Sequence, residues 1–208
     1  MQIVSVKTRL LFQSDEDKLS IIKMLENCRD VWNFISEQHF SVNDSGWLNC
    51  KNSIVSLHNK VYFKIREKFD IKSATVVQIE NSVLSTYRSM KSNKHKITRP
   101  AKKKKLSLSV NSTCISFKDD IISLISLDKR IKCKFQIFSR LENFLKNYKH
   151  GVPTIFVKDN EVWISLPFKI TEPELKSNLA VGIDLGLCRF AATSEGKLFK
   201  SKQFLKEK

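Results

Sequence analysis

The sequence lacks several patterns that would place it in a specialised class. Its five cysteines include no C-x-x-C pair, and its four histidines are scattered, so we expect no zinc site. The apolar runs end well short of the roughly 18 residues that a membrane helix needs, and the segment that begins at Met1 has none of the features of a secretory leader. These absences predict a cytoplasmic protein with reduced thiols and no membrane partner.

Acidic residues are scarce relative to basic ones, since 21 Asp and Glu accompany 37 Lys and Arg, for a net charge of +16. The excess is uneven. Residues 1–90 hold 12 basic and 10 acidic side chains, which leaves 25 basic and 11 acidic side chains for residues 91–208. A positive field of this size predicts a polyanionic partner for the second part of the chain. The hydrophobic content of 41% is enough to build a folded core.

The spacing of apolar residues along the sequence predicts one strand, then helices, then several short strands. Apolar residues alternate from Val4 to Phe12, as in a strand with one buried face. Ser14 and the three acids after it predict the start of a long helix, and two more helices follow, the third beginning near Ser73. Further strand patterns, a short helix that ends at Gly151 and a hairpin around Asp159-Asn160 complete this part. The short strands are expected at 106–110, 115–117, 121–125 and 131–137.

These elements predict an α+β fold, a small β-barrel with an inserted helical bundle. The barrel takes residues 1–13 and 91–177, and the insertion takes residues 14–90. Lys169 to Ser177, with its Glu-Pro-Glu sequence, is interpreted as a linker to a last piece at 178–208.

A basic run follows the helical region. Eight basic side chains and no acid lie between residues 91 and 105. Such a run releases counterions when it binds a phosphate backbone, although basic runs also occur as solvated loops. A second basic stretch begins at Lys129. A strand there would turn Lys132 and Lys134 to one face and Ile131, Cys133 and Phe135 to the other. The candidate nucleic-acid-binding residues are Lys94, Lys96, Arg99, Lys102, Lys103, Lys104, Lys105, Lys132 and Lys134.

Aromatic side chains offer a weaker indication, because a ring can stack on a base but at strand or helix spacing usually belongs to the core. None is assigned to a site. The rings considered are Tyr62, Tyr87, Phe117, Phe135, Trp163 and Phe168.

Asp184 is the candidate catalytic and metal-binding residue. It is a lone carboxylate in the apolar strand pattern Val181-Gly-Ile-Asp-Leu-Gly186, where a charge is rarely tolerated without a function. Glycines on both sides let a phosphate approach closely. The alternative is that Asp184 begins a turn with Gly186 in a left-handed conformation.

This motif, followed by Phe190-Ala-Ala-Thr193, resembles the first motif of the RuvC-like nuclease in TnpB-type (OrfB-family) transposases of bacterial insertion sequences, relatives of type V CRISPR effectors. The opening strand, Cys28-Arg-Asp-Val-Trp-Asn33, the Pro100 region and Val162-Trp-Ile-Ser165 occur in the order that such proteins use. The resemblance implies a wedge-like, oligonucleotide-binding-like barrel, a helical recognition insertion and the first strands of an incomplete RNase H-like (RuvC) domain after residue 178.

The resemblance also implies a guide RNA and DNA as partners and Mg²⁺ as cofactor, with Asp184 as the first metal-binding carboxylate. The family's other two catalytic carboxylates come from later parts of the fold, and only Glu195 and Glu207 follow Asp184 here. We therefore expect a truncated relative that binds nucleic acid and does not cleave alone, completed by a separate C-terminal half or associated as a homo-oligomer.

Two alternatives remain open. The first is an autonomous, non-catalytic nucleic-acid-binding module, which would show guide-independent, salt-sensitive affinity. The second is an actin-like or sugar-kinase-like ATPase, because Gly-Ile-Asp-Leu-Gly also resembles a phosphate-binding hairpin of that class. The position of the motif argues against this second alternative.

Overall fold

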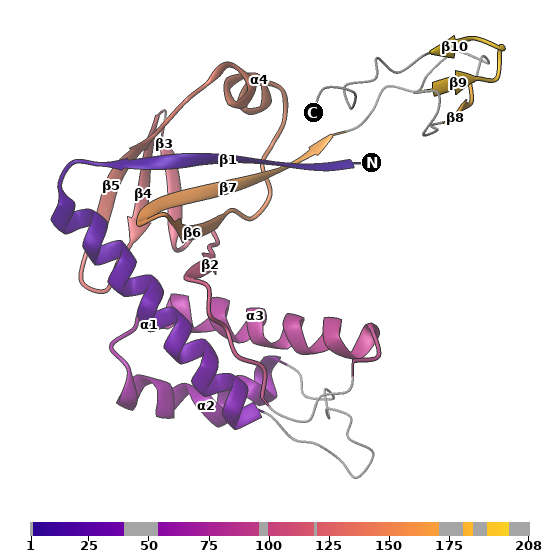
Figure 1. Cartoon of the computed structure of the whole chain (residues 1–208). Coiled ribbons are helices and arrows are strands. Elements are labelled where there is room, and N and C mark those ends of the chain that lie inside the picture. Colours follow the sequence, from indigo (N-terminus) through magenta and orange to yellow (C-terminus); the bar gives the residue numbers. More distant parts are fainter. Residues whose placement is uncertain are drawn as a thin grey trace, which may run out of the picture. The chain divides into compact units, whose positions relative to one another are not determined.

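The computed structural model describes residues 2–39, 54–95, 100–118, 120–170, 181–184 and 191–199. The chain divides into two compact units, Met1–Thr171 and Glu172–Lys208. Within the described residues, the first unit contains three packed helices, a curled antiparallel sheet and a fourth helix, and the second contains three short strands (Figure 1).

Three helices follow strand β1 (Gln2–Phe12): α1 (Asp15–His39), α2 (Ile54–Lys68) and α3 (Ser73–Ser92). The predicted start of α1 is confirmed, because the Asp17 amide donates to Ser14 Oγ at 3.2 Å and acids fill the first turn. The predicted start of α3 at Ser73 is also confirmed. Trp32 is buried at 4% exposure, and its Nε1 donates to Ser82 Oγ at 3.2 Å, which ties α1 to α3.

Seven strands form one sheet in the order β2-β6-β7-β1-β5-β4-β3. The first strand lies at its centre, paired with β7 from Gln2 to Arg9 and with β5 from Leu10 to Phe12. The other strands are β2 (Ser107–Ser109), β3 (Ile115–Lys118), β4 (Ile121–Ile125), β5 (Arg130–Phe135), β6 (Thr154–Lys158) and β7 (Glu161–Ile170). Closure of this sheet into an oligonucleotide-binding-like barrel stays a prediction.

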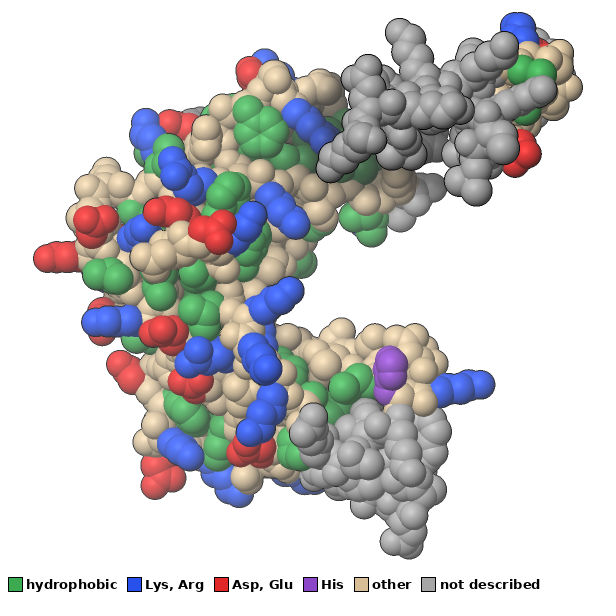
Figure 2. All heavy atoms as spheres, in the orientation of Figure 1, with side chains coloured by type: hydrophobic (Ala, Val, Ile, Leu, Met, Phe, Trp, Pro, Cys, Tyr) green, Lys and Arg blue, Asp and Glu red, His purple; other side chains and the backbone are tan. Residues whose placement is uncertain are grey.

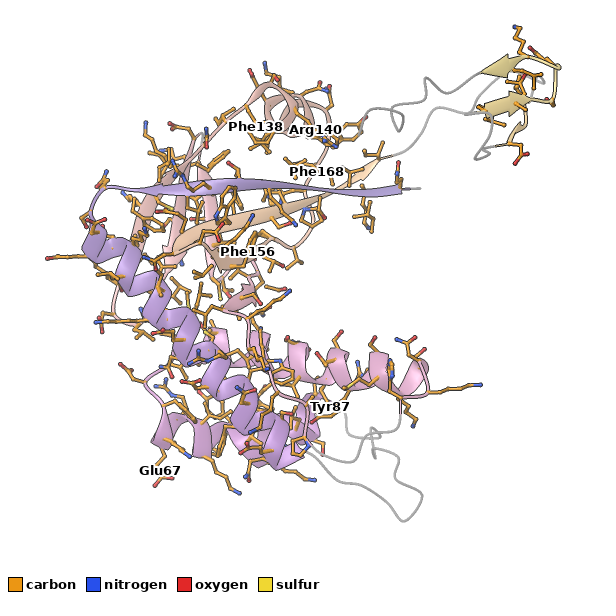
Figure 3. The ribbon with its side chains drawn as sticks, in the orientation of Figure 1. Glu67, Tyr87, Phe138, Arg140, Phe156 and Phe168 are labelled. Carbon is orange, nitrogen blue, oxygen red and sulfur yellow. The ribbon has the colours of Figure 1, made fainter. Side chains whose placement is uncertain are left out.

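One face of the sheet supplies the core. Alternate residues of β7 are fully buried, and helix α4 (Ser139–Asn147) packs on this face through the Phe144 ring, whose centroid lies 5.2 Å from that of Phe168. Phe168 is labelled in Figure 3. The opposite face of β1, β6 and β7, which we call the outer face, carries the alternate, more exposed side chains.

The predicted hairpin around Asp159-Asn160 is confirmed. These residues join β6 to β7 with φ of 52° and 59°, the pair of positive values that a type I′ turn requires. The predicted start of the linker at Lys169 is wrong, because Lys169 pairs with Ile3 and β7 continues to Ile170. A lysine is accommodated there because its side chain lies on the exposed face of the strand. Residues 171–177 lie outside the described residues.

The second unit contains strands β8 (Ile183–Asp184), β9 (Ala191–Thr193) and β10 (Leu198–Phe199) in the order β10-β9-β8. Its assignment as the start of an RNase H-like domain stays a prediction. Across the two units, none of the helices that the structure describes has both the length and the apolar character to cross a membrane.

Candidate nucleic-acid interface

Residues 101–105, here called the basic strap, run along the helices before the chain enters β2. The side-chain amide of Asn33, on α1, bonds to this segment as the backbone of a neighbouring strand would. Its Nδ2 donates to the Lys103 carbonyl at 3.2 Å, and the Lys103 amide donates to its Oδ1 at 2.7 Å. A side chain that pairs with both backbone groups of one residue fixes the position of that residue on the helix.

A buried polar cluster fixes the start of the strap. The Ala101 amide donates to the Tyr87 hydroxyl at 3.1 Å, and Ser36 Oγ donates to the Ala101 carbonyl at 2.7 Å. Ser36 Oγ and the Tyr87 hydroxyl lie 2.6 Å apart. Both side chains are fully buried, and Tyr87 is labelled on α3 in Figure 3. Helices α1 and α3 therefore both fix the position of the strap.

The four lysines of the strap differ in their surroundings. Lys102, Lys104 and Lys105 are exposed. The Lys103 ammonium instead donates to the Ser107 carbonyl at 2.6 Å, and burial lowers the pKa of this group from its usual value. Figure 2 shows Lys and Arg side chains following the segment between α3 and β2, where Figure 1 traces it. Three cations of the strap are thus exposed, while the fourth bonds to the backbone at the start of β2.

Of the remaining basic candidates before the strap, Lys96 and Arg99 lie outside the described residues. Lys94 is exposed and lies just beyond the end of α3 in the left-handed conformation, with φ of 55°. Its amide donates to the Lys91 carbonyl and the His95 amide donates to the Met90 carbonyl, each at 3.0 Å, which is a Schellman motif.

The predicted facing of β5 is confirmed: Lys132 and Lys134 are exposed, whereas Ile131, Cys133 and Phe135 are buried. The two lysines have different neighbours. Lys134 forms an ion pair with Asp120 at 2.9 Å, which lowers the pKa of that carboxyl, whereas Lys132 lies opposite Ser123 of β4. Their role in binding stays a prediction.

Asp184 lies exposed on β8, opposite Ala192 of β9. Val181 and Ile183 beside it are 47% and 65% exposed, whereas the apolar pattern predicted a buried strand. Within the described ranges, no three His, Cys, Asp or Glu side chains lie close enough together to hold a metal ion. The described residues alone therefore form no set of three metal ligands around Asp184.

Sequence reasoning found no function for His58, but the structure pairs it with a buried acid. Its Nδ1 lies 2.9 Å from Glu80 Oε2, and the Glu80 side chain is fully inaccessible. Desolvation raises the pKa of Glu80 above its usual value, and the hydrogen bond to His58 opposes this rise. The pair joins α2 to α3. Because the two residues are 22 positions apart, no local pattern in the sequence indicates their contact.

The described cysteines are structural rather than reactive. Cys28, Cys114 and Cys133 are buried and free, and burial raises the pKa of Cys28 and of Cys133 to about 12.

Replacing Asn33 by Ala removes both hydrogen bonds to Lys103. We expect the free energy of unfolding to fall by about 1–3 kcal/mol, because two backbone groups lose their partners. We also expect trypsin to cut faster within residues 102–105. Urea denaturation and timed tryptic digestion with mass spectrometry measure the two effects.

The matched control is Asn27→Ala, also on α1, because the Asn27 side chain donates at 2.5 Å to the carbonyl of Asp70, in the α2–α3 connection. This variant should lose stability without faster cleavage in the strap. Equal cleavage rates for the two variants would show that Asn33 does not hold the strap.

Glu80→Gln removes the ionisable group and keeps the side-chain shape. A carboxyl with a raised folded pKa favours the folded state most when protonated, so its contribution falls as the pH rises above the ordinary value of 4.5. The difference in unfolding free energy, wild type minus Glu80→Gln, should therefore decrease as the pH rises from 4.5. Urea denaturation across this range measures it, and parallel pH profiles would contradict the assignment.

No protein-family model matches the sequence. No curated protein matches it either. Among solved structures, a chain in the cryo-EM structure of a CRISPR-Cas12f ternary complex is similar, with a TM-score of 0.46 and 12% sequence identity. The match covers 89% of this chain and 48% of that chain, so the chain spans about half the length of its structural neighbour.

Proposed function

We propose that the chain binds nucleic acid, with the basic strap along the phosphate backbone. The proposal rests on the observation that one strap lysine points inward while the other three are exposed. Asn33, Ser36 and Tyr87 fix the backbone, and Lys103 is turned inward, so Lys102, Lys104 and Lys105 present their charges from a preordered segment. A preordered cationic segment binds a polyanion without the entropic cost of ordering a loop.

The resemblance to TnpB-type proteins supports a narrower form of the proposal. The bound nucleic acid is then a guide RNA that pairs with one strand of DNA, and the protein holds the RNA by its shape and backbone. Lys132, exposed on β5, would extend the contact. Asp184 would be the first carboxylate of a Mg²⁺ site that other residues complete, and we propose no cleavage by this chain alone.

Replacing Lys102, Lys104 and Lys105 together by Gln should weaken binding to single-stranded RNA. Each neutralised phosphate contributes roughly 0.7 to the slope of log affinity against log salt concentration, so the slope should become shallower by about 2. Fluorescence anisotropy with a labelled RNA over a series of salt concentrations measures both quantities.

The matched control is the triple change of Lys23, Lys60 and Lys64 to Gln, which removes the same charge from exposed positions on α1 and α2. It should leave the slope nearly unchanged. If both triple variants change the slope equally, binding depends on net charge and not on the strap.

The nature of the bound RNA distinguishes a guide-binding protein from an autonomous module. The chain is expressed with DNA from its own genomic neighbourhood, washed at high salt, and any co-purifying RNA is sequenced. One discrete RNA would support the guide-RNA proposal. Heterogeneous RNA that is removed by salt would favour a guide-independent module.

A further inference from the structure

The outer face of the sheet carries a row of side chains that the core does not use. Antiparallel pairing places Ser107 of β2 opposite Phe156 of β6, Phe156 opposite Trp163 of β7, and Trp163 opposite Arg9 of β1. We call these four residues the aromatic row. Directly opposed side chains in an antiparallel pair have Cβ atoms about 4.5–5.5 Å apart, so neighbours in the row lie side by side.

The rings of this row differ from five of the rings considered for stacking in the sequence. Tyr62 and Phe117 are partly buried but pack against the hydrophobic core. Tyr87, Phe135 and Phe168 are buried at 0%, 5% and 0% exposure and belong to the core. Trp163 and Phe156 are only half-buried, because they alternate with inward-facing residues of their strands. Phe156 is labelled in Figure 3. Two adjacent large apolar rings on an outer face form a partly accessible platform.

Trp163 also carries an unmet hydrogen-bonding group. Its Nε1 is shielded from solvent and has no hydrogen-bond partner within the described part of the chain. A shielded donor without a partner is costly, and a bound acceptor would relieve that cost after a small adjustment of the ring. This group distinguishes Trp163 from Trp32, whose Nε1 is satisfied by Ser82.

The row begins where the basic strap ends. The Lys103 ammonium donates to the carbonyl of Ser107, the first residue of the row. The carbonyl of Leu106, between strap and row, accepts from the Val157 amide at 3.0 Å, which fixes this end of the strap to β6. Only Leu106 separates Lys105 from the first residue of the row along the chain. A polyanion that lies on Lys104 and Lys105 is therefore close to the aromatic row.

The far end of the row is also cationic and open. Arg9 is exposed, and it lines a hollow of about 490 Å³ together with Ser14, Lys18 and Glu161. Two acids, Asp15 and Glu161, also line this hollow, and Glu161 is paired with Lys18 at 2.7 Å, which lowers the pKa of its carboxyl and offsets its charge. Lys18 therefore offsets the charge of one of the two acids near Arg9.

We propose that the aromatic row stacks an unpaired base of the nucleic acid whose backbone lies on the basic strap. The inference rests on the proposed function and adds to it that the bound nucleic acid is single-stranded. Only an unpaired nucleotide can turn the face of its base onto a protein ring, because the bases of a duplex cover one another. The row therefore selects single-stranded over duplex segments, and stacking makes this selection tolerant of sequence.

Three labelled probes of equal length test the inference by fluorescence anisotropy: a single-stranded oligodeoxyadenylate, its duplex, and a strand whose sugars lack bases. Stacking of one base is worth about tenfold in affinity. The wild-type chain should bind the base-bearing single strand about tenfold more tightly than the abasic strand. Trp163→Leu and Phe156→Leu should each reduce this preference without changing the salt slope.

Phe63→Leu is the matched control, since it removes an aromatic ring that is 78% exposed on α2 and should leave the preference intact. Circular dichroism establishes that each variant is folded. The comparison of probes needs only the wild type, so it stands even if Trp163→Leu fails to fold.

The outcomes separate the two proposals. Equal affinity of the wild type for the base-bearing and abasic strands would overturn the stacking inference and leave the strap proposal standing. A base preference that survives in both row variants would place the stacking ring elsewhere and overturn the inference too. If the wild type binds neither these probes nor the single-stranded RNA at low salt, both proposals fail.

Discussion

The pairing of β1 with two strands from much later in the sequence is the constraint on which the rest of the structure depends. One part of β1 pairs with β7 and the following part with β5, so a single strand joins both halves of the sheet. The cost of closing a loop grows only with the logarithm of its length, so three helices between β1 and β2 are tolerated. The buried Thr8 hydroxyl, which donates to the Gln136 carbonyl at 2.5 Å, strengthens the junction.

The position of the basic strap follows from this arrangement. The chain leaves α3 and must return to the sheet at β2, and it does so along α1. A backbone segment that passes over packed helices needs partners for its amides and carbonyls. Asn33, Ser36 and Tyr87 provide those partners from within the helices. The same bonds that satisfy the backbone therefore set the directions in which the strap lysines project.

The sequence predicts best what is local. The alternation in β5 predicts which way Lys132 and Lys134 face, and the Ser14 cap and the Asp159-Asn160 turn predict where elements begin and end, because each signal lies within a few residues. The partner of Asn33 is 70 residues away, and that of His58 is on another helix. Trp163 is ambiguous for another reason: apolar residues flank it on a strand, so its spacing fits either a core ring or a ring on the outer face.

The distribution of counter-charges bears on the proposed role of the strap more directly than the net charge of +16 does. Several exposed lysines already have carboxylate partners within 4 Å, including Lys129 with Asp17, Lys134 with Asp120 and Lys146 with Glu142. A phosphate that approaches these lysines must compete with the carboxylate, so each releases less free energy on binding. Among the described residues, no acid forms an ion pair with the exposed lysines of the strap. In the proposed function, the strap is therefore distinguished by exposed lysines on a backbone that Asn33, Ser36 and Tyr87 hold in place.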